Sequence, residues 1–237
     1  MPTLPAPLRG IVGRLKGVEP LGLMIFGLIS GGVLLFQWLA DEVLEGETKG
    51  IDETVLLALR QPGDLKRTIG SAWVSHAATD ITSLGGVTVL TLATFLTVLY
   101  LLSVRRKAMA LFVFLAIAGG WLLSTSLKIL IARQRPDIVP HLVDINDFSF
   151  PSGHAMLSAV TYLTLAGLLA RHQATRSARV FMLATGVFLT FIIGCSRVLL
   201  GVHYPTDVLA GWCAGATWAL MCWYLARRLI APPEQAH

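Results

Sequence analysis

Residues 150–170 read FPSGHAMLSAVTYLTLAGLLA, a short polar turn that leads directly into an apolar run. Within the turn, Pro151 restricts the backbone, Ser152 is a residue type that caps helices, and Gly153 permits close approach to the backbone. His154 follows and can exchange a proton near neutral pH. Unpaired N–H groups at a helix start attract anions, so we interpret this turn as one wall of a phosphate site. The turn alone would also fit an ordinary junction between loop and helix.

The composition is typical of a membrane protein. Hydrophobic residues make up 54% of the 237-residue chain and charged residues only 14%, with a mean hydropathy of +0.68. Uncharged runs recur at lengths near the roughly 20 residues that a helix needs to cross a bilayer. We therefore predict an all-α integral membrane protein in which residues 1–237 form a single transmembrane domain.

Six apolar runs predict six transmembrane helices. They are Leu21–Ala40, Ile81–Val104, Ala108–Arg133, His154–Ala170, Val180–Ser196 and Asp207–Ala226. The acidic segment 41–80 lies between the first two runs, and its apolar residues, such as Val55, Leu56 and Leu59, have helical spacing. This spacing predicts one or two short amphipathic helices on the membrane surface. A platform beside a lipid entrance and a solvated linker fit the segment equally well.

The basic residues predict the orientation of the chain. Lys and Arg are concentrated before residue 17, in the turns 105–107 and 171–179, and after residue 227. Six spans place these four segments on one side of the membrane, which the positive-inside rule assigns to the cytoplasm. We therefore predict a multi-pass plasma membrane protein with cytoplasmic N- and C-termini, and the compact loops favour the inner membrane of a bacterium. The extracytoplasmic side would hold the segments 41–80, 135–154 and 197–207.

The net charge of +5 and the cysteines argue against two other classes of function. Lys and Arg flank apolar runs, and the chain has no basic stripe with interleaved aromatics and no nucleic-acid motif, so we expect no nucleic-acid partner. The three cysteines all lie in apolar runs without CxxC spacing. We interpret them as small buried hydrophobes rather than as a disulfide or a metal site.

Basic residues on the extracytoplasmic side break the charge rule and suggest a function. They are Lys128, Arg133, Arg135 and Arg197. Lys128 and Arg135 are seven residues apart, which on one helix is two turns, about 10 Å, on nearly the same face. Lys128 also lies within apolar sequence, where an ionisable side chain is costly and usually has a partner. The alternative is that both residues extend to the lipid headgroups as ordinary interfacial cations.

A third group of polar residues surrounds the start of the last span. Arg197 lies where the fifth span meets water, and His203 and Asp207 follow it. A carboxylate one helical turn after a histidine can hold the imidazole in one tautomer and stabilise its positive form. Cations and the N–H groups of a helix start suit a phosphate. Two histidines can divide nucleophilic attack from proton transfer.

These residues form three blocks of fixed spacing. The blocks are Lys128-(six residues)-Arg135-Pro136, Pro151-Ser152-Gly153-His154 and Ser196-Arg197-(five residues)-His203-(three residues)-Asp207. The pattern resembles the type 2 phosphatidic acid phosphatase superfamily over residues 128–207, with the blocks in order and no departure at a key position. The six-helix layout is similar to that of the membrane branch of the family.

The resemblance implies a role for each of these residues. His203 would be the nucleophile that forms a phosphohistidine, Asp207 would orient and polarise it, and His154 would be the general acid and then the base for the hydrolytic water. The phosphoryl oxygens would be held by Lys128, Arg135, Arg197, Ser152 and the N–H of Gly153. The resemblance also implies that no metal or other cofactor is needed. The less favoured alternative is a metal loop made of Asp137, His141, Asp144 and Asp147.

The resulting hypothesis is a membrane lipid phosphatase that hydrolyses a lipid phosphate monoester or diphosphate at the extracytoplasmic face. The implied substrates are polyprenyl diphosphates such as undecaprenyl diphosphate, phosphatidylglycerol phosphate, phosphatidic acid and lipid A phosphates. The motifs do not separate these substrates, and the sequence does not indicate an oligomeric state. The alternatives are a lipid phosphotransferase that uses the same site and a non-catalytic carrier of lipid phosphates.

Overall fold

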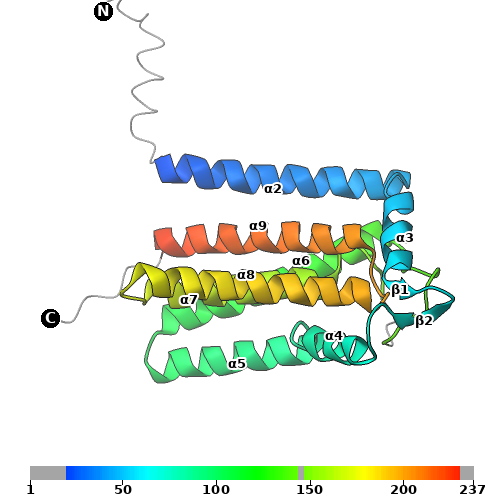
Figure 1. The fold of residues 1–237 in the computed structure, drawn as a ribbon. Helices are drawn as coiled ribbons and strands as arrows, with labels where there is room; N and C mark the ends of the chain where they lie inside the picture. The colour runs from blue at the N-terminus through cyan, green and yellow to red at the C-terminus, as the bar shows by residue number, and fades with distance from the viewer. Residues whose placement is uncertain (1–19, 144–146, 230–237) are drawn as a thin grey trace, which may run out of the picture.

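The computed structural model describes residues 20–143 and 147–229. Long helices run side by side, and short elements cover one end of the bundle (Figure 1). Helices long and apolar enough to span a membrane are α2 (Pro20–Glu45), α6 (Lys107–Ile131), α7 (Gly153–Arg171), α8 (Arg176–Leu199) and α9 (Pro205–Leu229). The pair α4 (Trp73–Ser83) and α5 (Val87–Ser103), which meet at a bend of 42°, passes the same test only when taken together and is then the sixth span. The prediction of an all-α membrane protein with six transmembrane helices is confirmed.

The second span is bent, whereas the sequence predicts one uninterrupted helix there. Gly85 and Gly86 lie in the break between α4 and α5, and glycine is unfavourable inside a helix. The backbone of Gly86 is extended, with φ −70° and ψ 147°. A Cβ on Gly85 would lie 2.5 Å from Cγ2 of Ile193, so the break also lets the chain approach α8 closely.

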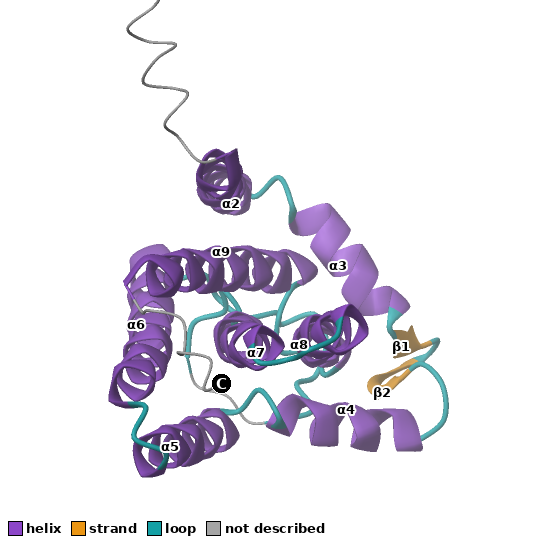
Figure 2. Ribbon diagram, turned by 90° about the vertical axis from the view of Figure 1, so that its left-hand side faces the viewer, coloured by secondary structure: helices purple, strands orange, loops and turns teal. Residues whose placement is uncertain are grey.

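Helix α7 lies at the centre of the bundle, among α5, α6, α8 and α9 (Figure 2). Two glycines of α9 pack against its first turns. A Cβ at Gly211 would lie 2.7 Å from the carbonyl oxygen of Ser152, and one at Gly215 would lie 2.5 Å from that of Met156. Small residues at such contacts let two helix backbones approach each other. This packing holds the start of α7 beside the first turns of α9, which brings two of the three sequence blocks together.

Residues 41–80 form a packed group of short elements at one end of the bundle (Figure 1). Of the one or two predicted amphipathic helices, α3 (Lys49–Ala58) lies within this segment, whereas α4 begins in it and leads across the bend into the second span. Between them, β1 (Arg60–Gln61) and β2 (Asp64–Thr68) pair antiparallel, which the sequence analysis did not predict. Gly63 has a φ of +84° in the turn of this hairpin, a conformation that glycine adopts readily. The segment is not a solvated linker, because Asp52, Leu56 and Arg60 are buried.

Helix ends differ from the predictions at three places. Helix α2 continues beyond Ala40 to Glu45, and α8 continues past Ser196, so that Arg197 lies on a helix. Helix α6 ends at Ile131, because Ala132 adopts the left-handed conformation with φ 49° and ψ 33°. The expectation that Lys128 and Arg135 share a face of one helix is therefore wrong.

Candidate active site

One cavity of about 190 Å³ lies at the start of α7. Its wall includes most of the predicted site residues: Lys128, Arg135, Gly153, His154, Arg197 and His203. Asp207 and Ser152 are fully buried and lie behind the wall. The three sequence blocks therefore meet in space, although they come from α6, α7, α8, α9 and the loops between them.

His203 is almost completely buried and presents one ring nitrogen to the cations of the cavity. Nη1 of Arg135 lies 3.1 Å from Nε2 of the ring. An arginine side chain only donates hydrogen bonds, so Nε2 carries the lone pair and the proton lies on Nδ1. Burial, followed by the positive charges of Arg135, Arg197 and Lys128, lowers the pKa of His203 well below its ordinary value. The ring is therefore neutral at pH 7, with an unprotonated nitrogen at the cavity.

Asp207 lies on the opposite side of the same ring. Its Oδ2 is 3.4 Å from Nδ1 of His203 and accepts the backbone N–H of Tyr204 at 2.8 Å. The hydroxyl of Ser149 donates to Oδ2 as well, and its Oγ is 3.3 Å from Nδ1. Ser149 thus links the imidazole to the carboxylate. No spacing pattern connects Ser149 to His203, so the sequence alone does not predict this contact.

Arg133 holds the second oxygen of Asp207. Nη1 of Arg133 donates to Oδ1 of Asp207 at 2.6 Å and to Oγ1 of Thr206 at 2.9 Å. Nη2 donates to Oδ2 of Asp52 at 2.8 Å, and the guanidinium lies 4.1 Å from the ring centroid of Tyr204. Burial alone would lower the pKa of Arg133, but the two carboxylates outweigh it and raise the pKa. Arg133 stands out in the sequence only as a basic residue on the extracytoplasmic side, and its place beside the site is a finding of the structure.

Asp52 connects helix α3 to the start of α9. Its carboxylate is fully buried and accepts the backbone N–H of Thr206 at 3.1 Å and the Thr206 hydroxyl at 2.6 Å. A carboxylate at this position satisfies a free N–H group of the α9 start, where the helix dipole also favours a negative charge. In the sequence, Asp52 is one of several acidic residues of the 41–80 segment, and nothing marks it out because its partners lie far away in the chain.

Asp147 occupies the space between two cations of the cavity. Nζ of Lys128 donates to Oδ2 of Asp147 at 2.7 Å, and Nη2 of Arg135 donates to Oδ1. Burial alone would raise the pKa of Asp147, but the two cations hold it at about 2. In the less favoured alternative of a metal loop, Asp147 would be a ligand, but its carboxylate is paired with Lys128 and Arg135, and Asp144 lies outside the described residues. Among the residues that the structure describes, no group of three or more His, Cys, Asp or Glu residues is placed to hold a metal ion.

The remaining wall of the cavity belongs to α7, α8 and the bend of the second span. A Cβ would lie 3.4 Å from Cδ2 of His154 if placed on Gly85 and 4.0 Å from its Nε2 if placed on Gly86, so the double glycine packs directly against this ring. Nη1 of Arg197 donates to Oγ1 of Thr82 at 2.9 Å, whereas its buried Nε has no hydrogen-bond partner among the described residues. A Cβ on Gly153 would lie 3.3 Å from Cε of Lys128. The absence of a side chain at Gly153 therefore allows the Lys128 side chain to pack closely against the start of α7.

Ser152 lies beside this wall without reaching the cavity. Its N–H donates to the carbonyl oxygen of Asp207 at 2.9 Å, which ties α7 to α9. Its buried hydroxyl has no hydrogen-bond partner within the described part of the chain. The structure therefore places the Gly153 backbone, but not the Ser152 side chain, at the cavity surface.

Comparison with known families agrees with this arrangement. The family model of the PAP2 superfamily matches residues 107–231, which is more than half of the chain. The chain belongs to the PAP2 superfamily. The resemblance seen in the three sequence blocks is therefore confirmed, and the matched residues contain every side chain that lines the cavity except those of the α4–α5 bend.

Relatives in the PAP2 superfamily include several named phosphatases. Phosphatidylglycerophosphatase B of Bacillus subtilis is 33% identical over 187 residues, which cover 77% of this chain and 86% of that protein. Lipid A 1-phosphatase of Rhizobium johnstonii is 34% identical over 136 residues, covering 49% of this chain and 50% of that protein. This PAP2 protein is accordingly a phosphatase, and its helices make it a multi-pass membrane protein.

A solved structure supports the same fold. The crystal structure of a transmembrane PAP2 type phosphatidylglycerolphosphate phosphatase from Bacillus subtilis matches with a TM-score of 0.77 and 28% identity. The match covers 88% of this chain and 98% of that one, so the two proteins share the fold over nearly their whole length.

Proposed function

We propose that this PAP2 phosphatase hydrolyses a lipid phosphate at the extracytoplasmic face of the membrane, through a phosphohistidine on His203. The observation that carries the proposal is the cavity in which an unprotonated Nε2 of His203 faces the side chains of Lys128, Arg135 and Arg197. Phosphoryl transfer depends mainly on positioning and on neutralising the charge of the phosphoryl oxygens, which this set of groups can do. The whole chain would act as one phosphatase domain.

In the first step, the three cations would bind the phosphoryl oxygens, and the free Nε of Arg197 offers an unused donor for one of them. Arg135 would transfer its Nη1 hydrogen bond from His203 to the phosphate, which frees the Nε2 lone pair. Nε2 then attacks phosphorus, and the bond from phosphorus to the leaving oxygen breaks. His154 would protonate that oxygen. The lipid then leaves as an alcohol when the substrate is a phosphate monoester, and as a lipid monophosphate when the substrate is a diphosphate.

In the second step, water would attack the phosphohistidine. His154, now neutral, would take a proton from this water, and the phosphorus–nitrogen bond would break to release inorganic phosphate and regenerate His203. Asp207 and Ser149 would hold the Nδ1 proton throughout, so the positive ring of the intermediate faces a carboxylate. Every proton and electron pair in this cycle is supplied by the chain, the lipid and one water molecule.

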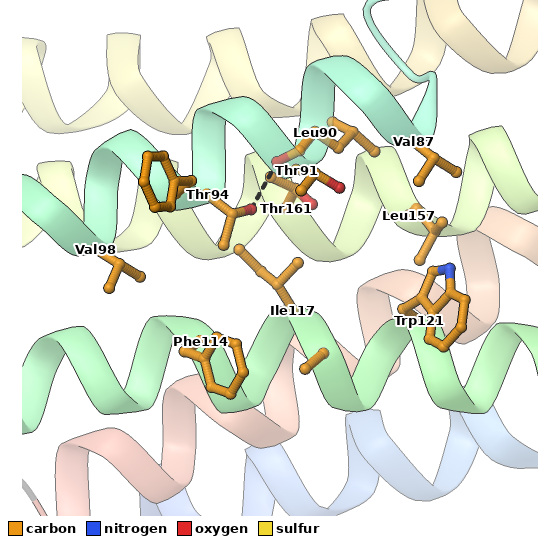
Figure 3. A pocket seen from close by; sticks show the side chains of 12 residues that line it. Val87, Leu90, Thr91, Thr94, Val98, Phe114, Ile117, Trp121, Leu157 and Thr161 are labelled. Atoms are coloured by element: carbon orange, nitrogen blue, oxygen red, sulfur yellow. Dashed lines mark hydrogen bonds between the residues drawn. The ribbon is translucent and has the colours of Figure 1, made fainter.

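An apolar groove supports a lipid as the substrate. The groove has a volume of about 480 Å³ and lies between α5, α6 and α7, with Phe114 and Thr161 among the residues around it (Figure 3). It shares Val87, Trp121 and Leu157 with the wall of the catalytic cavity. A lipid could therefore keep its chain in the membrane part of the protein while its phosphate reaches His203.

Phosphatidylglycerol phosphate is the first substrate to test. The relatives that match over most of both chains are named for it: the Bacillus subtilis phosphatidylglycerophosphatase B and the solved Bacillus subtilis structure. Shorter matches carry other names, including an undecaprenyl-diphosphatase of Sulfolobus acidocaldarius that is 37% identical over 70 residues. This match covers only 30% of this chain and 30% of that protein, so it carries less weight in the choice of substrate.

The sidedness in this proposal rests on the basic segments of the sequence, which favour cytoplasmic termini and an extracytoplasmic cavity. A reporter that is active only outside the cytoplasm tests it directly. Fused after Arg228, the reporter should be silent, whereas fused into the exposed β1–β2 turn it should be active. The opposite pattern would place the cavity on the cytoplasmic side.

The activity is tested by phosphate release from a panel of four lipids in detergent, with a chelator present. The panel contains phosphatidylglycerol phosphate, phosphatidic acid, a polyprenyl diphosphate and lipid A. We expect wild type to release inorganic phosphate from at least one of them and His203→Ala to release none. His172→Ala is the matched control, because this exposed histidine lies at the far end of α7. Equal release by His203→Ala and wild type would refute the mechanism, and transfer of the phosphate to another lipid would indicate a phosphotransferase.

A further inference from the structure

The carboxylate of Asp147 takes the place in the cavity that a phosphoryl group would need. One oxygen accepts from Lys128 at 2.7 Å and the other accepts from Arg135, the same two cations that the proposed mechanism assigns to phosphate. The carboxylate is therefore a competitor that the chain itself supplies. Its side chain is 57% exposed, so rotation out of the cavity would place it in water rather than in the apolar interior.

Backbone groups hold the two cations independently of this carboxylate. Lys128 also donates to the carbonyl oxygen of Phe148 at 2.5 Å, and Arg135 donates to those of Asp147 and Val202 at 2.7 and 2.5 Å. These bonds can persist when the Asp147 side chain leaves. The exchange of carboxylate for phosphate therefore requires a side-chain rotation and no rebuilding of the site.

We propose that Asp147 is an affinity-determining residue that competes with phosphate for Lys128 and Arg135, so that the site retains only ligands that bind these cations tightly enough to displace it. The proposal rests on the proposed function of the same cavity. A carboxylate offers one negative charge and two oxygens, whereas a terminal phosphoryl group offers up to two negative charges and three oxygens. The Nε group of Arg197, which has no partner among the described residues, can donate a hydrogen bond to the third oxygen. Terminal phosphates would therefore displace Asp147, and singly charged phosphodiesters of ordinary membrane lipids would not. Return of the carboxylate would also help inorganic phosphate to leave after hydrolysis.

The test measures how tightly inorganic phosphate binds to wild type and to Asp147→Asn. Stabilisation of the melting temperature by added phosphate gives the dissociation constant without any need for turnover. We expect Asp147→Asn to bind phosphate about tenfold more tightly, because a carboxylate paired with two cations is replaced by a neutral amide of the same shape. Asp147→Glu keeps the competing charge and should stay within about threefold of wild type. Asp137→Asn is the control, since this residue is exposed in the same loop but does not line the cavity.

Inhibition of lipid hydrolysis by inorganic phosphate supplies a second readout. Asp147→Asn should show a lower inhibition constant by a similar factor, together with a lower KM. Equal or weaker phosphate binding by Asp147→Asn would overturn the proposal, because it would mean that Asp147 is neutral or helps to hold the ligand. A wild type that binds phosphate but hydrolyses no lipid would instead refute the proposed function, and the binding comparison would still decide the role of Asp147.

Discussion

Asp52 on α3 and Arg133 beyond the end of α6, which are 81 positions apart in the chain, form a buried ion pair with Nη2 and Oδ2 2.8 Å apart. Arg133 joins Asp52 to Asp207, and the Ser149 hydroxyl links Asp207 to His203. A continuous set of hydrogen bonds therefore connects the short elements outside the bundle to the proposed nucleophile. Residues 41–80 thus have a specific connection to the site, through one carboxylate.

Asp52→Ala should lower kcat by about 10- to 100-fold, because Arg133 loses one of its two carboxylates and can no longer fix Asp207 and the His203 ring. Loss of one partner of a buried pair should also reduce the free energy of unfolding by about 3 kcal/mol. Phosphate binding should change little, since the cavity cations remain. The measurements are kcat, the dissociation constant of phosphate and a denaturation curve.

The matched control for this variant is Glu53→Gln, which removes the neighbouring acid of α3. Glu53 is half-buried and forms a long ion pair with the exposed Lys49, 3.7 Å away, so its loss should leave kcat and stability nearly unchanged. If Asp52→Ala lost stability but kept wild-type kcat in the folded fraction, Asp52 would be structural and would not position the site.

The pH dependence should reflect the lowered pKa of His203. A histidine whose pKa lies below its ordinary value of about 6.5 stays neutral as the pH falls through 6, and Nε2 keeps its lone pair. On the acid side, kcat/KM should therefore begin to fall only below pH 6. This profile is first corrected for the ionisation of the substrate phosphate, which is measured separately. A corrected acid limb at pH 6.5 or above would contradict an unprotonated, buried His203 in the free enzyme.

The apolar groove should matter for long-chain substrates only. Ala118→Phe would place a ring in the groove and displace about two methylene groups of a bound chain, each worth about 0.8 kcal/mol. We therefore expect the KM of a long-chain lipid phosphate to rise about tenfold, with no change for a short water-soluble phosphate ester. Ala108→Phe makes the same change near the start of α6, outside the groove, and serves as the control. Equal effects of Ala118→Phe on both substrates would argue against chain binding in the groove.

The spans and the three blocks could be predicted because their signals are local. A long apolar run predicts a transmembrane helix by itself. The four-residue spacing of His203 and Asp207 likewise keeps the two side chains within about one helical turn of each other, independently of the rest of the chain. The helix ends were harder. Ala132 adopts the left-handed conformation and ends α6 at Ile131, so Arg135 does not lie on the helix. Alanine rarely adopts this conformation, so the sequence does not predict it.

The other residues around the site could not be predicted because their partners are distant. Asp52 reaches Thr206 across 154 positions, and Ser149 reaches Asp207 across 58, so no window of sequence contains both members of either pair. Asp147 was considered only as a possible metal ligand, since a loop carboxylate near a histidine fits that pattern too. Its pairing with Lys128 and Arg135 depends on how the loop returns over α6, which the sequence does not encode locally.

The central claim is a covalent phosphate on Nε2 of His203, and trapping that intermediate tests it most directly. The experiment uses the His154→Gln variant and a ³²P-labelled substrate whose leaving group needs no protonation. This variant should form the phosphohistidine but hydrolyse it slowly, because it lacks the base that activates water. After a rapid quench, we predict an acid-labile, alkali-stable label that mass spectrometry assigns to His203 and that is absent from His203→Ala. Label on any other residue, or hydrolysis of the same substrate by His203→Ala at the wild-type rate, would contradict the mechanism.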